Sequence, residues 1–194
     1  MVCVVIPTVR NLTFLEGWKD EFQDCIGIII EDRNEKDIET PKNYFNKTYH
    51  YTWKDIRKDF GKDEWIFSRK NAGIRSYGFW KAYQLGADVI ITIDDDCYPT
   101  EPGFVKKHVE NLSWKAHTDW FPTYPDPQYM YTRGFPYSVR NKLSVMVSHG
   151  LWSGALDLDG KTESKLQHVL TESSYPPIRQ VIPNGHFFPM CSMN

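Results

Sequence analysis

The amino-acid sequence predicts an α/β fold in which a mostly parallel sheet is flanked by helices. Three runs of apolar, mostly branched residues, at 2–6, 26–30 and 89–93, are typical of strands buried on both faces of a parallel sheet. Apolar residues recur at helical spacing between these runs, as expected for strand–helix–strand units with right-handed crossovers. The length of 194 residues fits one domain, so we expect a single domain over residues 1–194.

The first part of the chain is expected to contain two strands, a helix and a loop. Residues 2–6 should form a strand that stops at Pro7, which has no backbone N–H. Leucine and aromatic residues at helical spacing across 12–22 predict a helix that covers the sheet. A second strand is expected at 26–30, and the charged stretch 32–47, which has no apolar period, should be a loop.

The remaining elements are predicted with the same rules. Apolar residues at helical spacing predict a helix over 74–85, with Gly86 as its C-cap before the strand at 89–93. A further helix is expected at 104–112, and residues 182–190 resemble a final pair of short strands. The periodicity is weaker in the second half of the chain, so fewer elements can be predicted there.

Composition and charge exclude several classes of function. The formal net charge of −2 and the pI near 6.3 do not fit a nucleic-acid-binding protein, which usually carries a clustered basic surplus. The four cysteines are widely spaced without a C-x-x-C pair, so neither a zinc site nor a disulfide framework is indicated. No apolar stretch reaches the roughly 20 residues of a membrane span, and the N-terminal apolar run is too short for a signal peptide. We expect a cytoplasmic protein without membrane insertion.

An acidic cluster, Asp94-Asp95-Asp96, directly follows the third predicted strand. Open α/β sheets bind ligands at the carboxyl ends of their strands, and adjacent carboxylates repel one another unless a cation neutralises them. Carboxylate oxygens prefer hard ions, so the cluster indicates a Mg²⁺ or Mn²⁺ site that also binds a diphosphate. Because side chains alternate along a strand, Asp94 and Asp96 should hold the metal, and Asp95 should contribute less. The alternative is a solvated acidic turn or a cap of the helix at 104–112.

Other polar residues are expected at the same edge of the sheet. Thr8 and Arg10 follow the first strand and Asp32 follows the second, where a hydroxyl and a carboxylate can bind a base or ribose. Arg69 and Arg75 lie near the start of the second predicted helix, where backbone N–H groups favour anions such as a diphosphate. Each residue alone is equally well explained by a turn or a solvated charge. Only their convergence on one edge predicts a substrate site.

Five segments spread along the whole chain together resemble the reversibly glycosylated polypeptides. Their order and approximate spacing also agree with that family, which makes the resemblance more specific than any single D-x-D pattern. The segments are 5–11 (VIPTVRN), 91–97 (ITIDDDC), 133–140 (RGFPYSVR), 147–152 (VSHGLW) and 188–194 (FPMCSMN). The chain departs from the family at Asp32-Arg33, where Asp-Gly is common.

The resemblance implies a GT-A-like, Rossmann-like fold, a UDP-pentose substrate and a Mn²⁺ or Mg²⁺ ion at Asp94 and Asp96. The family interconverts UDP-arabinopyranose and UDP-arabinofuranose, and an arginine in its R-G-Y-P-F-S-L-R motif becomes reversibly glycosylated. The first arginine of that motif matches Arg133 and the second matches Arg140. A guanidinium stays protonated and is a poor nucleophile, so chemistry alone favours a diphosphate clamp for both arginines. The resemblance assigns the covalent role to Arg133.

Two further residues of these segments are candidate substrate contacts. His149 is expected to contact the sugar or diphosphate, and Trp152 is expected to stack on the sugar face. The alternatives are a buried, hydrogen-bonded histidine and a core tryptophan, which are the more frequent outcomes for these residue types.

Three functions therefore remain open from the sequence. The first is a UDP-arabinopyranose mutase that glycosylates itself at Arg133. The second is a UDP-sugar-dependent glycosyltransferase with a separate acceptor. The third is a non-catalytic binding or assembly subunit, within a homo- or hetero-oligomer. The family continues well past the segment at 188–194, so the chain is expected to be either a fragment or a minimal relative that lacks the C-terminal portion.

Overall fold

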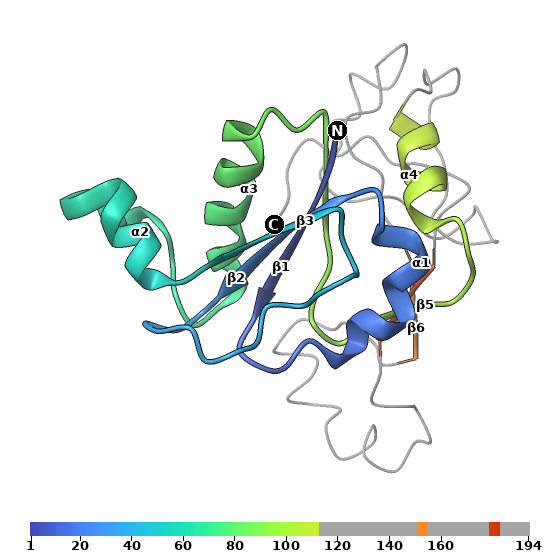
Figure 1. Ribbon diagram of the computed structural model, residues 1–194, viewed down its shortest axis with the longest axis horizontal. Coiled ribbons are helices and arrows are strands. Elements are labelled where there is room, and N and C mark those ends of the chain that lie inside the picture. The colour runs from blue at the N-terminus through green and yellow to red at the C-terminus, as the bar shows by residue number, and fades with distance from the viewer. Residues whose placement is uncertain (113–150, 155–178, 183–194) are drawn as a thin grey trace, which may run out of the picture. The chain divides into compact units, whose positions relative to one another are not determined.

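The computed structural model describes residues 1–112, 151–154 and 179–182 (Figure 1). The chain divides into two compact units, Met1–Tyr98 and Pro99–Asn194, and each unit is described by itself. The single domain expected over residues 1–194 stays a prediction.

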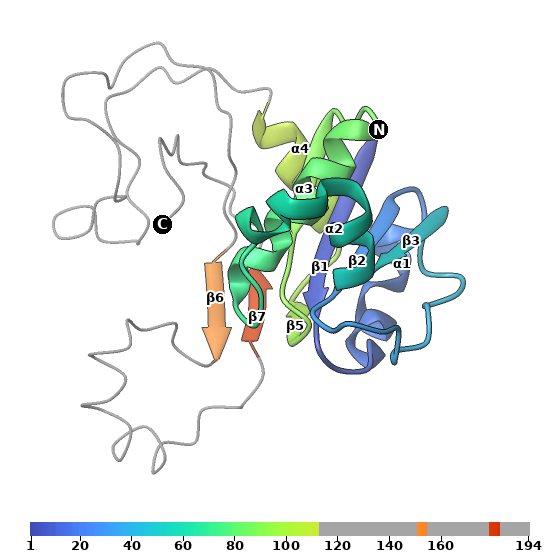
Figure 2. The ribbon, with the colours of Figure 1, turned by 90° about the vertical axis from the view of Figure 1, so that its left-hand side faces the viewer.

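The first unit is built on a sheet of four parallel strands in the order β3-β2-β1-β4. The strands are β1 (Val2–Thr8), β2 (Ile26–Glu31), β3 (Lys47–Tyr51) and β4 (Val89–Thr92). Figures 1 and 2 show helices on both faces of this sheet, with α1 (Lys19–Phe22) on one face and α2 (Trp53–Phe60) and α3 (Arg75–Gln84) on the other. The predicted α/β fold with a parallel sheet flanked by helices is confirmed.

The first strand runs through Pro7 to Thr8, so the expected stop at Pro7 is wrong. Pro7 lies opposite Ile30 of β2, whereas β4 pairs with β1 only as far as Val5. On its β4 side Pro7 is therefore beyond the paired part of the sheet. A proline without an N–H is tolerated there, as it is on an edge strand.

One face of the sheet packs against α2 and α3 through a cluster of buried apolar side chains. The cluster contains Cys3, Val5, Ile28, Ile30, Ile56, Phe67, Ile74, Tyr77 and Ala82. Helix α3 approaches the sheet closely at Gly78, where a Cβ atom would lie 2.4 Å from Cγ1 of Val5. The hydroxyl of Tyr77 donates a hydrogen bond of 2.6 Å to Asp59, which fastens α3 to α2. The start of α3 is thereby fixed relative to the ends of β1 and β2.

Helix α3 begins and ends nearly as the sequence predicts. A short 3-10 segment, η3 (Ala72–Ile74), precedes it. Gly86 has a positive φ of 79° and donates from its backbone N–H to the carbonyl of Tyr83 at 2.9 Å. Ala87 donates to the carbonyl of Ala82 at 3.1 Å, which completes a Schellman motif. The predicted role of Gly86 as a C-cap is confirmed.

The helix expected over 12–22 is broken into two parts. A 3-10 segment, η1 (Thr13–Trp18), leads into the four-residue α1. No side chain caps η1 at Leu12, and Gly17 lies inside the segment, both of which disfavour a longer α-helix. Trp18 nevertheless anchors the segment, because its indole N–H donates to the carbonyl of Cys97 at 2.7 Å and its ring stacks on Phe22.

Strand β3 and helix α2 were not predicted from the sequence. The loop expected over 32–47 ends one residue earlier than expected, because β3 begins at Lys47. Helix α2 begins with a capping box in which Thr52 and Asp55 satisfy each other's backbone N–H groups. The 3-10 segment η2 (Gly61–Ile66) follows α2 directly. The T-x-x-D pattern was a usable signal for this helix start.

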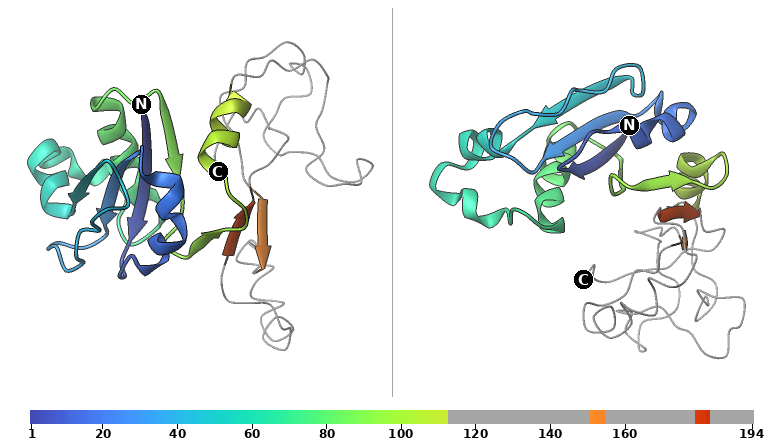
Figure 3. Two further views of the ribbon diagram at one scale, coloured as in Figure 1. Left: turned by 45° about the vertical axis from the view of Figure 1, so that its right-hand side comes forward. Right: turned by 90° about the horizontal axis from the view of Figure 1, so that it is seen from below.

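In the second unit the structure describes one helix and a pair of strands. The predicted helix at 104–112 is confirmed as α4 (Phe104–Leu112). Strand β6 (Leu151–Gly154) pairs antiparallel with β7 (Arg179–Ile182), and a short strand, β5 (Cys97–Pro99), spans the boundary between the units (Figure 3). The strand pair expected over 182–190 lies outside the described residues except for Ile182. None of the described helices is long and apolar enough to cross a membrane.

Candidate functional site

The acidic cluster lies in a turn just beyond β4. The strand ends at Thr92, and the backbone N–H of Cys97 donates to the carbonyl of Asp94 at 3.3 Å. The three carboxylates therefore do not alternate along a strand, and the argument that ranked them by strand faces does not apply. Each carboxylate is instead distinguished by its own contacts.

Asp94 forms an ion pair with Arg75, the first residue of α3. A terminal guanidinium nitrogen of Arg75 lies 2.5 Å from Oδ1 of Asp94, and the two side chains are 23% and 30% exposed. Nε of Arg75 donates to the carbonyl of Ala72 at 3.0 Å, which fixes the side chain against the start of its own helix. The structure thus brings the predicted Arg75 and Asp94 together at the carboxyl edge of the sheet.

Asp95 is held against the end of β1. Its Oδ2 accepts a hydrogen bond of 2.7 Å from the hydroxyl of Thr8 and lies 3.2 Å from Nε of Arg10. The side chain of Asp95 is only 9% exposed, whereas that of Arg10 is 61% exposed. Thr8 also accepts a hydrogen bond from the backbone N–H of Arg10 at 3.1 Å. Thr8, Arg10 and Asp95 therefore converge, as the predicted parallel sheet requires.

Asp96 has no basic partner among the described residues. Its Oδ1 accepts a weak contact of 3.9 Å from Sγ of Cys97, and its side chain is partly exposed. Within the described residues, Asp96 is thus the one carboxylate of the turn without a guanidinium, while its two neighbours each have one.

The donor set of the turn fits a hard divalent cation whose remaining ligands come from a substrate. Within residues 1–112, 151–154 and 179–182, no three carboxylate, imidazole or thiolate groups converge as a complete metal cage. Mg²⁺ in nucleotide sites is commonly held by one or two carboxylates, waters and the substrate's phosphates rather than by an all-protein cage. Two carboxylates of the Asp94–Asp96 turn match that requirement in chemistry.

Asp32 and Arg69 belong to a neighbouring cluster that includes Trp53. The carboxylate of Asp32 accepts a hydrogen bond of 2.7 Å from the indole N–H of Trp53, and Asp32 donates from its backbone to the carbonyl of Thr8 at 2.9 Å. The guanidinium of Arg69 lies 5.2 Å from the centre of the Trp53 ring and pairs with Glu64. Its buried Nε has no hydrogen-bond partner in the described part of the chain. Sequence reasoning missed Trp53: the T-x-x-D pattern around it signals a helix start but not a contact with Asp32.

A buried polar cluster beneath this edge was also missed. Glu31, the last residue of β2, is fully buried and accepts hydrogen bonds from the backbone N–H groups of Asp37 and Ile38 at 2.9 and 3.4 Å. It also contacts Nε2 of His50 at 2.8 Å, while Nδ1 of His50 contacts the hydroxyl of Thr40 at 3.1 Å. Burial lowers the pKa of His50, although the adjacent Glu31 opposes this effect. The cluster fixes the 32–46 loop to β2 and β3.

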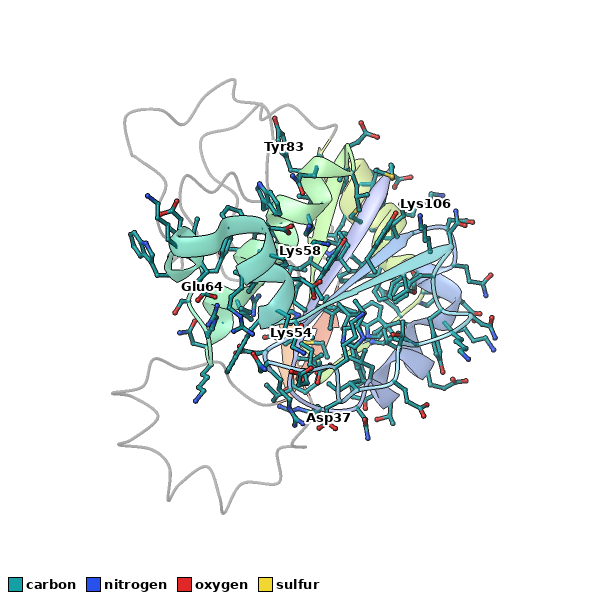
Figure 4. All side chains as sticks on the ribbon, turned by 60° about the vertical axis from the view of Figure 1, so that its left-hand side comes forward. Asp37, Lys54, Lys58, Glu64, Tyr83 and Lys106 are labelled. Atoms are coloured by element: carbon teal, nitrogen blue, oxygen red, sulfur yellow. The ribbon has the colours of Figure 1, made fainter. Side chains whose placement is uncertain are left out.

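Arg33 connects the loops that follow β1 and β2. A terminal nitrogen of its guanidinium donates to the carbonyl of Val9 at 2.7 Å, and another nitrogen pairs with Asp37. Figure 4 shows Asp37 and Lys54 at the carboxyl end of the sheet, whereas Tyr83 at the end of α3 lies at the opposite end. Arg33, which stands where the family commonly has glycine, therefore connects the loop after β1 to the loop after β2 at the candidate site.

Four predicted residues cannot be placed in this site. Arg133, Arg140 and His149 lie outside the described residues. Trp152 lies in β6, where its backbone pairs with Val181 of β7 and its side chain is not described. Their roles stay predictions.

The fold and this edge define an α/β protein whose parallel sheet gathers acidic and basic side chains at its carboxyl end, where such sheets bind ligands. The family model for reversibly glycosylated polypeptides matches residues 1–194. The chain belongs to the reversibly glycosylated polypeptide family, which confirms the resemblance of its five segments.

Curated relatives support this assignment at moderate identity. The chain is 33% identical over 201 aligned residues to UDP-arabinopyranose mutase 2 of Arabidopsis thaliana, covering 98% of this chain and 54% of that protein. It is 34% identical to UDP-arabinopyranose mutase 3 of the same plant and 32% identical to UDP-arabinopyranose mutase 1 of Oryza sativa subsp. japonica, with the same coverage. The chain thus spans about half the length of the curated relatives that it matches.

Proposed function

We propose that the chain binds a UDP-pentose through Mn²⁺ or Mg²⁺ and interconverts UDP-arabinopyranose and UDP-arabinofuranose. The observation that carries this proposal is the meeting of Asp94, Asp95, Arg75 and Thr8 at one edge of a parallel sheet, in a member of this family. Acidic and basic groups together suit a ligand that brings both a cation and a diphosphate.

Asp94 and Asp96 are the proposed metal ligands, because Asp95 is largely buried and already held by Thr8 and Arg10. The bound cation would stabilise UDP as it leaves the anomeric carbon. Arg75 lies at the first position of α3, and its guanidinium can pair with a phosphate oxygen.

The base and ribose are proposed to lie near the end of β2. Asp32 keeps a second carboxylate oxygen beside the one that accepts from Trp53, and that oxygen can accept from a ribose hydroxyl or a base N–H. Arg69, whose buried Nε has no hydrogen-bond partner among the described residues and whose guanidinium lies near the Trp53 ring, is the proposed second cation for the diphosphate. Thr8 and Arg10 complete this side of the site through Asp95.

Ring contraction requires the bond between the anomeric carbon and the β-phosphate oxygen to break and reform. Arg133 is the proposed transient acceptor: a carbon–nitrogen bond forms, its guanidinium gives a proton to a carboxylate base, and UDP leaves. While the sugar is on Arg133, the C1–O5 bond breaks and O5 takes up a proton, then O4 loses its proton and attacks C1 to close the smaller ring. UDP then displaces the guanidinium, which takes back its proton from the base. Arg140 is proposed to hold the diphosphate, with His149 and Trp152 on the sugar.

One alternative is a non-catalytic subunit that binds or assembles with a longer relative in an oligomer. Incubation with UDP-arabinopyranose and Mn²⁺, followed by separation of nucleotide sugars and intact-protein mass spectrometry, separates the possibilities. We expect UDP-arabinofuranose and a pentose adduct that peptide mapping places on Arg133. Net UDP release only with an added acceptor would indicate a glycosyltransferase. Binding without turnover would indicate the subunit.

A further inference from the structure

The two arginines at the acidic turn are placed differently. Arg10 pairs with Asp95, whose carboxylate is 9% exposed and also bound by Thr8. Arg75 pairs with the side chain of Asp94, which is 30% exposed, and the carboxylate of Asp94 has no second partner among the described residues. The Arg75–Asp94 contact therefore can open more easily, because a partly exposed ion pair is weak and water can replace either partner.

A metal ion and a guanidinium compete for the same carboxylate. Arg75 approaches Oδ1 of Asp94 at 2.5 Å, so a cation held by Asp94 would compete with the guanidinium for the charge of that carboxylate. The displaced guanidinium stays near the site, since Nε of Arg75 remains bound to the carbonyl of Ala72 at 3.0 Å. It would also stay at the start of α3, next to the acidic turn that would hold the cation and its diphosphate.

The geometry points to a counterion exchange at Asp94. Arg75 neutralises Asp94 in the free protein, then releases Asp94 to the incoming cation and pairs with the diphosphate that the cation carries. This inference rests on the proposed UDP-sugar function and adds to it a role for the ion pair before substrate binds. Arg10 and Asp95 take no part in the exchange and stay paired.

The exchange couples the two ligands. When the metal binds alone, Arg75 loses Asp94 and gains no other anion. When the metal binds with a diphosphate, the diphosphate becomes the new anionic partner of Arg75. Mn²⁺ and UDP should therefore each strengthen the binding of the other, by the same factor in both directions. Arg75 thus opposes the metal alone and favours the metal–nucleotide pair.

The test measures the two affinities separately in the full chain. Free Mn²⁺ is followed by its electron paramagnetic resonance signal, and UDP binding at saturating Mn²⁺ is followed by calorimetry. For Arg75→Gln we expect Mn²⁺ alone to bind about threefold tighter, because a weak competing ion pair is gone. We expect UDP with Mn²⁺ to bind about tenfold more weakly, because a charge-assisted contact is lost. Arg75→Lys should shift both affinities in the same directions by less.

Arg57→Gln is the matched control, since the guanidinium of Arg57, a half-buried residue of α2, donates to the side-chain oxygen of Asn34 and not to a carboxylate of the acidic turn. It should change neither affinity. If Arg75→Gln fails to fold, Arg75→Lys carries the test, because it keeps the charge and most of the stem. Changes of the same sign in both affinities, or none, would overturn the exchange while leaving the proposed function in place. Failure of the wild-type chain to bind Mn²⁺ and UDP would overturn both.

Discussion

Two groups of carboxylates lie at the carboxyl edge of the four-stranded sheet, and they have different partners. Glu31 at the end of β2 is fully buried, and its partners are two backbone N–H groups and the imidazole of His50. Asp94 in the turn after β4 is partly exposed, and its partner is the guanidinium of Arg75. A buried carboxylate with fixed donors holds the structure in place, whereas an exposed one with a movable cation can exchange partners for a ligand.

Replacement of Glu31 should have the largest effect on stability. Glu31→Ala leaves the N–H groups of Asp37 and Ile38 and the ring of His50 without their acceptor in a fully buried position. We expect the free energy of unfolding to fall by about 3 kcal/mol. Urea denaturation of the full chain measures it.

Glu35→Ala is the control, because Glu35 and its partner Lys54 are both exposed. Its effect should stay within about 0.5 kcal/mol. Equal effects of the two replacements would show that Glu31 is not a structural anchor and would remove the contrast with Asp94.

The acidic turn should respond in binding rather than in stability. Asp94→Asn and Asp96→Asn should each weaken Mn²⁺-dependent UDP binding about a hundredfold, because each removes a charged metal ligand. Asp95→Asn should be milder, since Asp95 is held by Thr8 and Arg10. Calorimetric titration of UDP in the presence of Mn²⁺ measures these affinities, and undiminished binding by the first two variants would exclude a metal site here.

The sequence predicted the sheet and its edge but not every contact made there. Branched apolar runs such as 26–30 are recognisable because a strand buried on two faces needs them, and parallel pairing then places Thr8 and the acidic turn at one edge. The strand-alternation argument for Asp94 to Asp96 failed because β4 ends at Thr92, and strand ends are not encoded in periodicity.

The Glu31 cluster was not predictable for a different reason. Glu31 and His50 lie on neighbouring strands, and their contact depends on the register that brings Ile29 of β2 opposite His50 of β3. Strand β3 is short and partly polar, so its pattern does not stand out from the charged loop before it. Pairings across a sheet carry no local signal in one sequence, whereas a capping box such as Thr52 to Asp55 does.

The buried cluster should also make stability depend on pH. Burial lowers the pKa of His50 in the folded chain, against the opposing effect of Glu31 and with Lys36 and Asp55 as the other nearby charges. The unfolded chain therefore binds the proton first as pH falls below about 6.5, and stability should fall by up to about 1.4 kcal/mol for each pH unit in that window. Above about pH 6.5 His50 is neutral in both the folded and the unfolded chain, so this loss of stability should be absent there.

Urea denaturation between pH 7.5 and pH 5 measures this slope. In His50→Gln the side-chain amide can still donate to Glu31 but does not titrate, so the slope between those values should become shallower. An unchanged slope would mean that other groups titrate in this window, and the cluster would then be a fixed anchor without pH dependence.

The smallest effects are expected around Asp95, whose contacts combine features of the buried Glu31 and of the partly exposed Asp94. The side chain of Asp95 is nearly as buried as that of Glu31. Like Asp94, however, it pairs with an arginine that solvent can reach. Thr8→Val removes the hydroxyl that donates to Asp95 at 2.7 Å and should cost about 1 kcal/mol of stability. Arg10→Gln removes a pair whose cation is 61% exposed and should cost less than about 0.5 kcal/mol. Thermal unfolding of both variants ranks the contacts: if Arg10→Gln proves the more damaging, Asp95 depends on its cation and belongs with the exchangeable Asp94 rather than with Glu31.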